Sequence, residues 1–154
     1  MLTAGVVVGE TPAMRATSTA TVSSPSSHVW EVLSDHEGMS HWGPGVSVTL
    51  RSEGSPDRNG VGAVRVIDAP GPMPSIVEEV VVFEPGRAMS YRALSGVPLR
   101  NYGGDVVLSE VAGGTEISYT VTADQRVPWV ERVVVKAISF ALLKALVRRV
   151  DATA

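Results

Sequence analysis

The nucleophilic and titratable residues of this chain do not form a common catalytic pattern. His28, His36 and His41 lack the spacing of a helical zinc motif, because Gly38 interrupts any helix between the last two. The absence of cysteine excludes thiolate nucleophiles, cysteine metal sites and disulfides. No serine stands in a Gly-x-Ser-x-Gly elbow, and the glycine patterns of phosphate and dinucleotide loops are missing. We therefore expect no metal and no other cofactor, and the sequence assigns no catalytic residue.

Arg65 and Glu78 form the polar pair with the clearest chemical meaning. Paired positions in an antiparallel hairpin sum to a constant, so a symmetric loop from Ala69 to Pro74 places Arg65 opposite Glu78. Both fall on the face that carries the large apolar side chains. Opposite charges on such a face must pair or meet a polar ligand to offset their desolvation. An internal ion pair and a ligand anchor, in which arginine binds a carboxylate, phosphate or enolate, both remain open.

All three tyrosines fall on that same face. A turn at Pro85-Gly86 places Val80 opposite Tyr91 and Val82 opposite Met89, and the later turns add Tyr102 and Tyr119. An apolar ring with a single hydroxyl is the sparse polar decoration expected in a cavity for a hydrophobic ligand. Ordinary core packing explains the three rings equally well.

Two loop tips and one tryptophan are candidates for the mouth of such a cavity. Met73 lies in a stiff, proline-rich loop and suits contact with varied apolar ligands. Val97-Pro98-Leu99 forms a second apolar tip at the same end of the sheet, so the two tips form either a gate or an ordinary loop contact. Trp42, beside Gly43-Pro44-Gly45, would cover the entrance or pin its loop to the core.

The turns define the elements that must position these residues. Ser24-Pro25 predicts a helix of about ten residues, with serine as N-cap and proline at the first helical position. Pro128 precedes a long helix over 129–149. The expected strands are a short edge strand at 16–22 and six more at 46–52, 60–68, 75–84, 87–94, 100–110 and 115–123. This order is α+β rather than alternating β-α-β.

The long C-terminal helix carries a wide apolar face, which we expect to be buried against the sheet and to bring Ile138 to the ligand. Its basic residues, Arg132, Lys136, Lys144 and Arg148, lie on another side. The face comprises Val130, Val133, Val134, Ala137, Ile138, Ala141, Leu142 and Ala145. On the sheet, Val64, Val66, Val81 and Phe83 fall on the polar face, where bulges or packing of the first helix would account for them.

The element order and several short motifs resemble the START-like helix-grip superfamily (SRPBCC), in particular its polyketide cyclase/dehydratase and lipid-binding branch. The motifs are Ser24-Pro25 before Val29-Trp30-Glu31-Val32-Leu33, then Trp42-Gly43-Pro44-Gly45-Val46, Tyr91-Arg92, Gly113-Gly114-Thr115 and the terminal helix. The resemblance covers 16–150 as one domain. It implies a curved antiparallel sheet of about seven strands wrapped around the C-terminal helix, with an apolar cavity between them. Residues 1–15 are expected to form a flexible extension.

Composition narrows the class of partner. The chain has 13 Lys+Arg against 16 Asp+Glu and shows no basic stripe in sequence, which argues against nucleic acid and anionic lipid. The apolar run 137–143 is far shorter than the roughly 20 residues of a membrane span. Without a signal peptide or cysteines, we expect a cytoplasmic protein with no integral membrane contact. The oligomeric state is not indicated.

Three functions fit these patterns. The leading one is binding of a hydrophobic small molecule or lipid between sheet and helix, through Trp42, Arg65, Met73, Glu78, Tyr91, Leu99, Tyr102, Tyr119 and Ile138. The alternative is a polyketide cyclase/dehydratase-type enzyme, with Glu78 as base, Arg65 stabilising an enolate and Tyr91 or Tyr102 as acid. The third is a structural module whose side chains fill the interior, which a cavity of about 300 Å³ or more would exclude.

Overall fold

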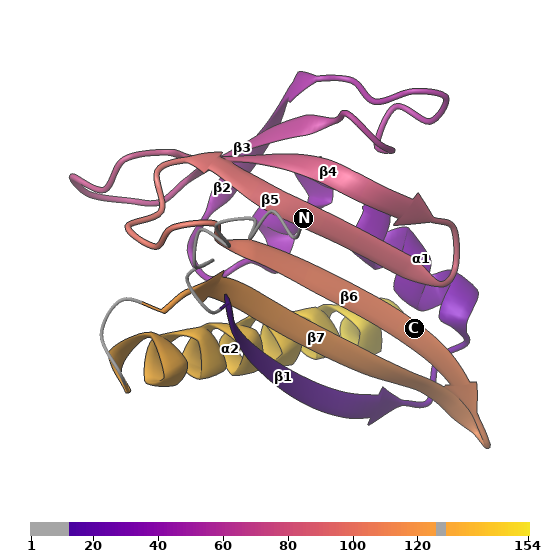
Figure 1. The fold of residues 1–154 in the computed structure, drawn as a ribbon. Coiled ribbons are helices and arrows are strands. Elements are labelled where there is room, and N and C mark those ends of the chain that lie inside the picture. The colour runs from indigo at the N-terminus through magenta and orange to yellow at the C-terminus, as the bar shows by residue number, and fades with distance from the viewer. Residues whose placement is uncertain (1–12, 126–128) are drawn as a thin grey trace, which may run out of the picture.

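Strands and helices follow one another in the predicted order (Figure 1). The computed structural model describes residues 13–125 and 129–154. Most of the expected extension 1–15, and Pro128, therefore lie outside the described residues. The elements are β1 (Ala13–Val22), α1 (Ser26–Ser34), the 3-10 helix η1 (Glu37–His41), β2 (Ser47–Ser52), β3 (Val64–Asp68), β4 (Ile76–Glu84), β5 (Ala88–Ser95), β6 (Gly103–Val111), β7 (Gly114–Asp124) and α2 (Val130–Thr153).

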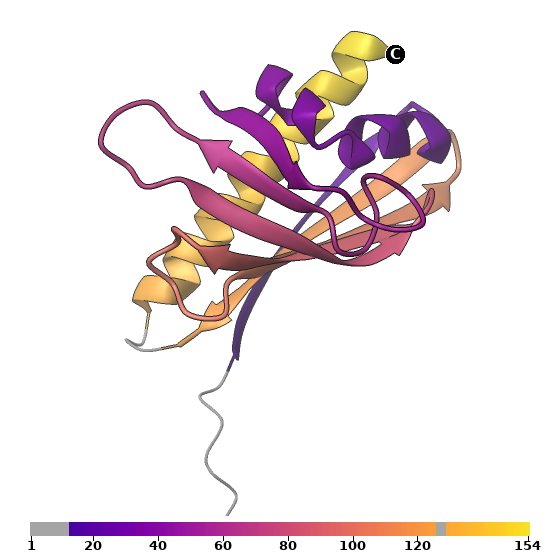
Figure 2. The same ribbon diagram turned by 90° about the horizontal axis from the view of Figure 1, so that it is seen from above.

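The seven strands form one antiparallel sheet in the order β1-β7-β6-β5-β4-β3-β2. The predicted meander is confirmed. β1 forms one edge of the sheet and pairs with β7 along its full length. Because β1 and β2 lie at opposite edges, α1 and η1 carry the chain across one end of the sheet. The sheet is curved, and α2 runs across its concave face (Figure 2). This is the α+β helix-grip architecture that the sequence predicts.

The hairpin register is confirmed at the positions that matter most for the interior. Arg65 pairs with Glu78, and Val80 pairs with Tyr91. The predicted pairing of Val82 with Met89 is wrong, because a bulge between Val80 and Val82 shifts the register by one residue.

The bulge in β4 also explains one apolar residue that seemed to face solvent. Phe83 pairs with Met89 instead and turns toward the core. There its ring meets Trp30 of α1 edge-on, with ring centroids 5.0 Å apart. Val81 and Val82 are left more than a third exposed.

The start of each N-terminal element differs from the prediction. The strand expected at 16 begins at Ala13. Ser24 does not cap α1; Pro25 is the N-cap, in an extended conformation with φ −67° and ψ 156°. The start of α1 is instead tied to the sheet, because the Thr115 hydroxyl donates a hydrogen bond to the Ser24 carbonyl at 2.8 Å.

The face by which α2 packs on the sheet differs from the predicted one. The buried positions are Glu131, Val135, Ser139, Leu143, Leu146 and Val150. Val133 and its predicted companions Val130, Val134, Ala137 and Ala141 are exposed. The polar Ser139 tolerates burial because its hydroxyl shares a 2.8 Å hydrogen bond with Ser18 of β1.

Truncation of a residue on each face of α2 distinguishes the two. Leu146→Ala removes a fully buried side chain and should lower the free energy of unfolding by about 2 to 5 kcal/mol. Val133→Ala, at a position 65% exposed, should change it by less than about 0.5 kcal/mol. Urea unfolding monitored by circular dichroism gives both values. A larger loss for Val133→Ala would place the packing face where the sequence pattern put it.

Candidate functional site

A cavity of about 440 Å³ lies between α2 and the concave face of the sheet. Of the predicted site residues, Arg65, Met73, Glu78, Tyr91, Leu99, Tyr102 and Ile138 line it. Trp42 and Tyr119 do not. The sequence analysis missed several lining residues, namely Met39, Val46, Ile67, Val134 and Leu142. Alternation along β3 already placed Ile67 inward with Arg65, whereas Val134 reaches the cavity only from the edge of α2.

The two apolar loop tips meet at one side of this cavity. Met73 and Pro74 come from the β3–β4 loop, and Val97 to Leu99 come from the β5–β6 loop. Gly96 lies so close to Ser75 that a Cβ atom there would meet the Ser75 carbonyl oxygen at 2.0 Å. Its φ of 89° is also in the left-handed region that favours glycine. The two loops therefore touch through their backbones.

A buried ion pair forms the polar part of the cavity wall. Arg65 and Glu78 are 4% and 3% exposed, and Nε and Nη2 of Arg65 donate to Glu78 Oε1 at 3.0 and 2.9 Å. The guanidinium carbon lies 4.6 Å from the centre of the Tyr91 ring, within the range of a cation–π contact. Burial by itself would lower the pKa of Arg65. The Glu78 charge and the neighbouring tyrosines raise this pKa by more than burial lowers it, so it lies above its ordinary value. Arg65 is therefore charged at neutral pH.

His36 completes this cluster, although the sequence analysis considered it only as a metal ligand. It is fully buried, and its Nδ1 accepts a hydrogen bond from Arg65 Nη1 at 3.3 Å. Since Nδ1 accepts, the proton sits on Nε2, which donates to the Asn59 carbonyl at 2.7 Å. Burial and the Arg65 charge lower the pKa of His36 to about 4. A neutral imidazole thus holds the far side of the Arg65 guanidinium.

The three tyrosines lie beside the ion pair, and two of them, Tyr91 and Tyr102, line the cavity with it. The hydroxyls of Tyr91 and Tyr119 share a hydrogen bond of 2.7 Å. Gly104 makes room for this arrangement, because a Cβ atom there would lie 2.3 Å from the Tyr91 ring. Tyr119 therefore orients Tyr91 rather than lining the cavity. Burial raises the pKa of Tyr119 to about 12 and also raises the pKa values of Tyr91 and Tyr102, so all three hydroxyls are protonated at neutral pH.

Trp42 lies at a different hollow from the one predicted. It packs against both clusters of the core and lines a depression between residues 41–44 and the C-terminal half of α2. Pro44 lines this depression and the cavity alike, so the two are neighbours. Trp42 therefore does not line the cavity, and its contacts with both core clusters agree with the other alternative, that it pins its loop to the core.

Residues 13–125 and 129–154 bring no three histidine, aspartate or glutamate side chains close enough to hold a metal ion. Across the same ranges, no helix combines the length and apolar character needed to cross a bilayer.

A curved antiparallel sheet that grips a C-terminal helix over a cavity defines the helix-grip class of fold. The family model described as polyketide cyclase / dehydrase and lipid transport matches residues 13–152, and the chain belongs to this family. Among solved structures, the crystal structure of Ara h 8.0201 has a TM-score of 0.71 at 18% identity, covering 92% of this chain and 99% of that one. At that identity the likeness shows the fold alone. A search of curated proteins finds no match.

Breaking the buried ion pair on one side should cost far more than breaking an exposed one. Arg65→Met leaves the buried Glu78 without its ion-pair partner and should lower the free energy of unfolding by about 3 to 5 kcal/mol. Arg65→Met with Glu78→Gln should recover most of that loss. Arg92→Met is the matched control. Its 2.8 Å pair with Glu79 joins β5 to β4, as the Arg65–Glu78 pair joins β3 to β4, but it is exposed. This variant should lower the free energy of unfolding by about 1 kcal/mol or less. Equal losses for Arg65→Met and Arg92→Met in urea unfolding would contradict the buried pair.

The lowered pKa of His36 makes stability depend on pH. Between pH 6.5 and about 4 the unfolded state binds a proton that the folded state does not, so stability falls as pH is lowered through this window. The loss attributable to His36 should reach about 3 kcal/mol at pH 4.

Urea unfolding from pH 7 to pH 4 measures this effect. His36→Gln should flatten the slope relative to wild type, whereas His41→Gln, at an exposed position, should leave it unchanged. Identical slopes for wild type and His36→Gln would show that His36 does not carry the pH dependence.

Proposed function

We propose that this protein binds a hydrophobic small molecule or lipid carrying one or two polar groups in the cavity between α2 and the sheet. The observation that carries the proposal is an apolar cavity of about 440 Å³ whose wall contains one buried ion pair. A cavity of this size lies within the usual range of ligand pockets, and it argues against a module filled by its own side chains.

The polar groups of the wall favour a ligand without net charge. Arg65 and Glu78 neutralise each other, so a charged ligand would have to compete with the existing pair for its partner. Arg65 has N–H groups beyond those that bond Glu78 and His36, and Tyr102 adds a protonated hydroxyl. These donors suit a carbonyl, hydroxyl or ether oxygen on an otherwise apolar molecule.

The enzymatic alternative receives less support from the same contacts. Two bonds from Arg65 hold Glu78 Oε1, so transferring a proton to this carboxylate would weaken a buried ion pair. The raised pKa values of Tyr91 and Tyr102 make these phenols hydrogen-bond donors rather than proton-transfer acids. The family name includes both cyclase chemistry and lipid transport, and the geometry favours binding.

Filling the cavity should abolish ligand binding. N-phenyl-1-naphthylamine, a neutral fluorescent probe, should bind the parent protein, and Ile138→Trp should weaken binding by at least about tenfold because the indole occupies the site. The measurement is a fluorescence titration, with native mass spectrometry to identify any hydrophobic molecule retained on purification.

Val133→Trp is the matched control, since it adds the same side chain to an exposed position of α2 outside the lining. It should bind the probe as the parent does. Failure of the parent to bind, or equal weakening in both variants, would refute binding in this cavity. The enzymatic alternative would be established instead if the parent turned over a reactive polyketide chain and Glu78→Gln abolished that turnover.

A further inference from the structure

The depression lined by Trp42 has the dimensions and walls of a second binding site. It encloses about 510 Å³, and we refer to it as the Trp42 pocket. Trp42 and Pro44 form one wall, and Ala141 and Ala145 of α2 form the other. Alanine side chains let a flat group approach the helix closely, while the indole offers an apolar face for stacking.

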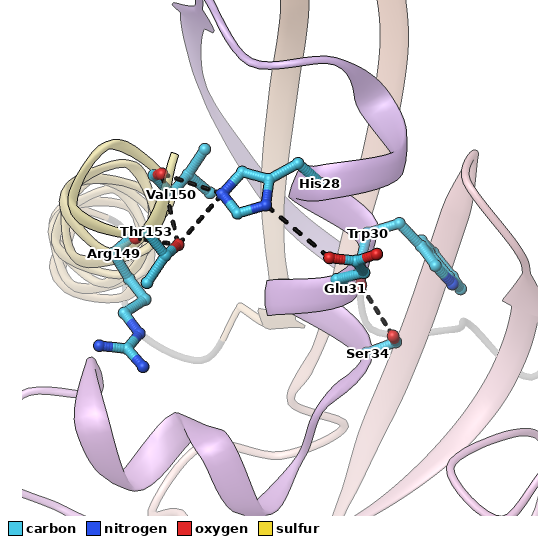
Figure 3. Close-up of polar contacts among 7 residues, drawn as sticks. All are labelled: His28, Trp30, Glu31, Ser34, Arg149, Val150 and Thr153. Carbon is cyan, nitrogen blue, oxygen red and sulfur yellow. Dashed lines mark hydrogen bonds and ion pairs between the residues drawn. The ribbon is translucent and has the colours of Figure 1, made fainter.

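Three cations from α2 also line this pocket, namely Lys144, Arg148 and Arg149. No ion pair joins any of them to a carboxylate of residues 13–125 or 129–154. Lys144 instead lies 5.9 Å from the ring centre of Phe140. In Figure 3 the Arg149 guanidinium lies apart from the Glu31 carboxylate, which contacts His28. Among the other described cations, Arg15, Arg58, Arg65, Arg87 and Arg92 each pair with an acidic residue, whereas Arg51, Arg100, Arg132 and Lys136 do not. What distinguishes Lys144, Arg148 and Arg149 is that they line one hollow.

The position of these cations on α2 does not account for them. Basic residues near a helix C-terminus are stabilised by the helix dipole, but the effect is confined to the last turn. The last turn of α2 carries no basic residue. In a chain with a net charge of −3, three unpaired cations around one hollow create a local field of the opposite sign. The apparent scatter of basic residues in the sequence hides this cluster.

We propose that the Trp42 pocket binds a small organic anion, in which a flat apolar group lies between Trp42 and the alanines of α2 while its anionic group meets Lys144, Arg148 and Arg149. Arginine suits this role because its planar guanidinium bonds carboxylate and phosphate oxygens in pairs. The site is separate from the cavity and does not depend on the function proposed for it. The two sites also differ in net charge: three cations line the Trp42 pocket, whereas the charged residues of the cavity wall neutralise each other.

Three probes separate the contributions: 1-naphthyl phosphate, neutral 1-naphthol and inorganic phosphate. Titration calorimetry should show 1-naphthyl phosphate binding the parent at least about tenfold more tightly than inorganic phosphate. The indole N–H resonance of Trp42, assigned with Trp42→Phe, should shift on addition of 1-naphthyl phosphate. Arg148→Gln with Arg149→Gln should weaken that binding by about tenfold or more and leave the affinity for 1-naphthol unchanged.

Arg100→Gln with Arg132→Gln is the matched control, because it removes two exposed cations outside the pocket. It should change the affinity for 1-naphthyl phosphate less than about twofold. Ile138→Trp, which fills the cavity, should bind 1-naphthyl phosphate as the parent does. This variant therefore distinguishes binding in the Trp42 pocket from binding in the cavity. The proposal is overturned by no binding to the parent, by equal losses in the two double variants, or by inorganic phosphate binding as tightly as 1-naphthyl phosphate.

Discussion

One helix cannot cover the concave face of a seven-stranded sheet, and the interior of this protein follows from that limit. α2 packs mainly on β1 and β7 at one side of the sheet. The inward side chains of β3, β4 and β5 therefore face a space that only the edge of α2, the loop tips and η1 enclose. The fold therefore leaves a cavity. An apolar molecule could fill it, because filling it would remove apolar surface from water.

The buried charges are arranged so that this apolar space tolerates them. Arg65 is held by Glu78 on one side, by His36 on another and by the face of Tyr91. Two of these partners are fixed in turn: His36 by the Asn59 carbonyl, and Tyr91 by Tyr119 and the open position at Gly104. A network in which each member has a partner restricts the orientation of its polar groups, as a selective binding site requires.

The sequence predicted the features that depend on neighbours in a hairpin and failed where distant segments decide. Arg65 and Glu78 were predictable because a short turn fixes which residues face each other. The bulge near Val81 carries no sequence signal, so the register beyond it was wrong. The packing face of α2 was missed because a serine such as Ser139 is expected at the surface and a valine such as Val133 in the core. Ser139 is buried because it bonds to Ser18, and Val133 is exposed. His36 and Trp42 owe their surroundings to residues far along the chain, and spacing alone does not reveal such contacts.

The close approach of Gly96 to Ser75 bears on the kinetics of exchange. Loops that touch through their backbones cannot open independently, because no side chain between them can rotate aside. The β3–β4 and β5–β6 loops are thus joined at one side of the cavity. Opposite them stand Val134 and Ile138 in the N-terminal half of α2. A ligand held in the cavity would then leave by movement of that half of the helix, and its residence time would depend on helix stability more than on either loop alone.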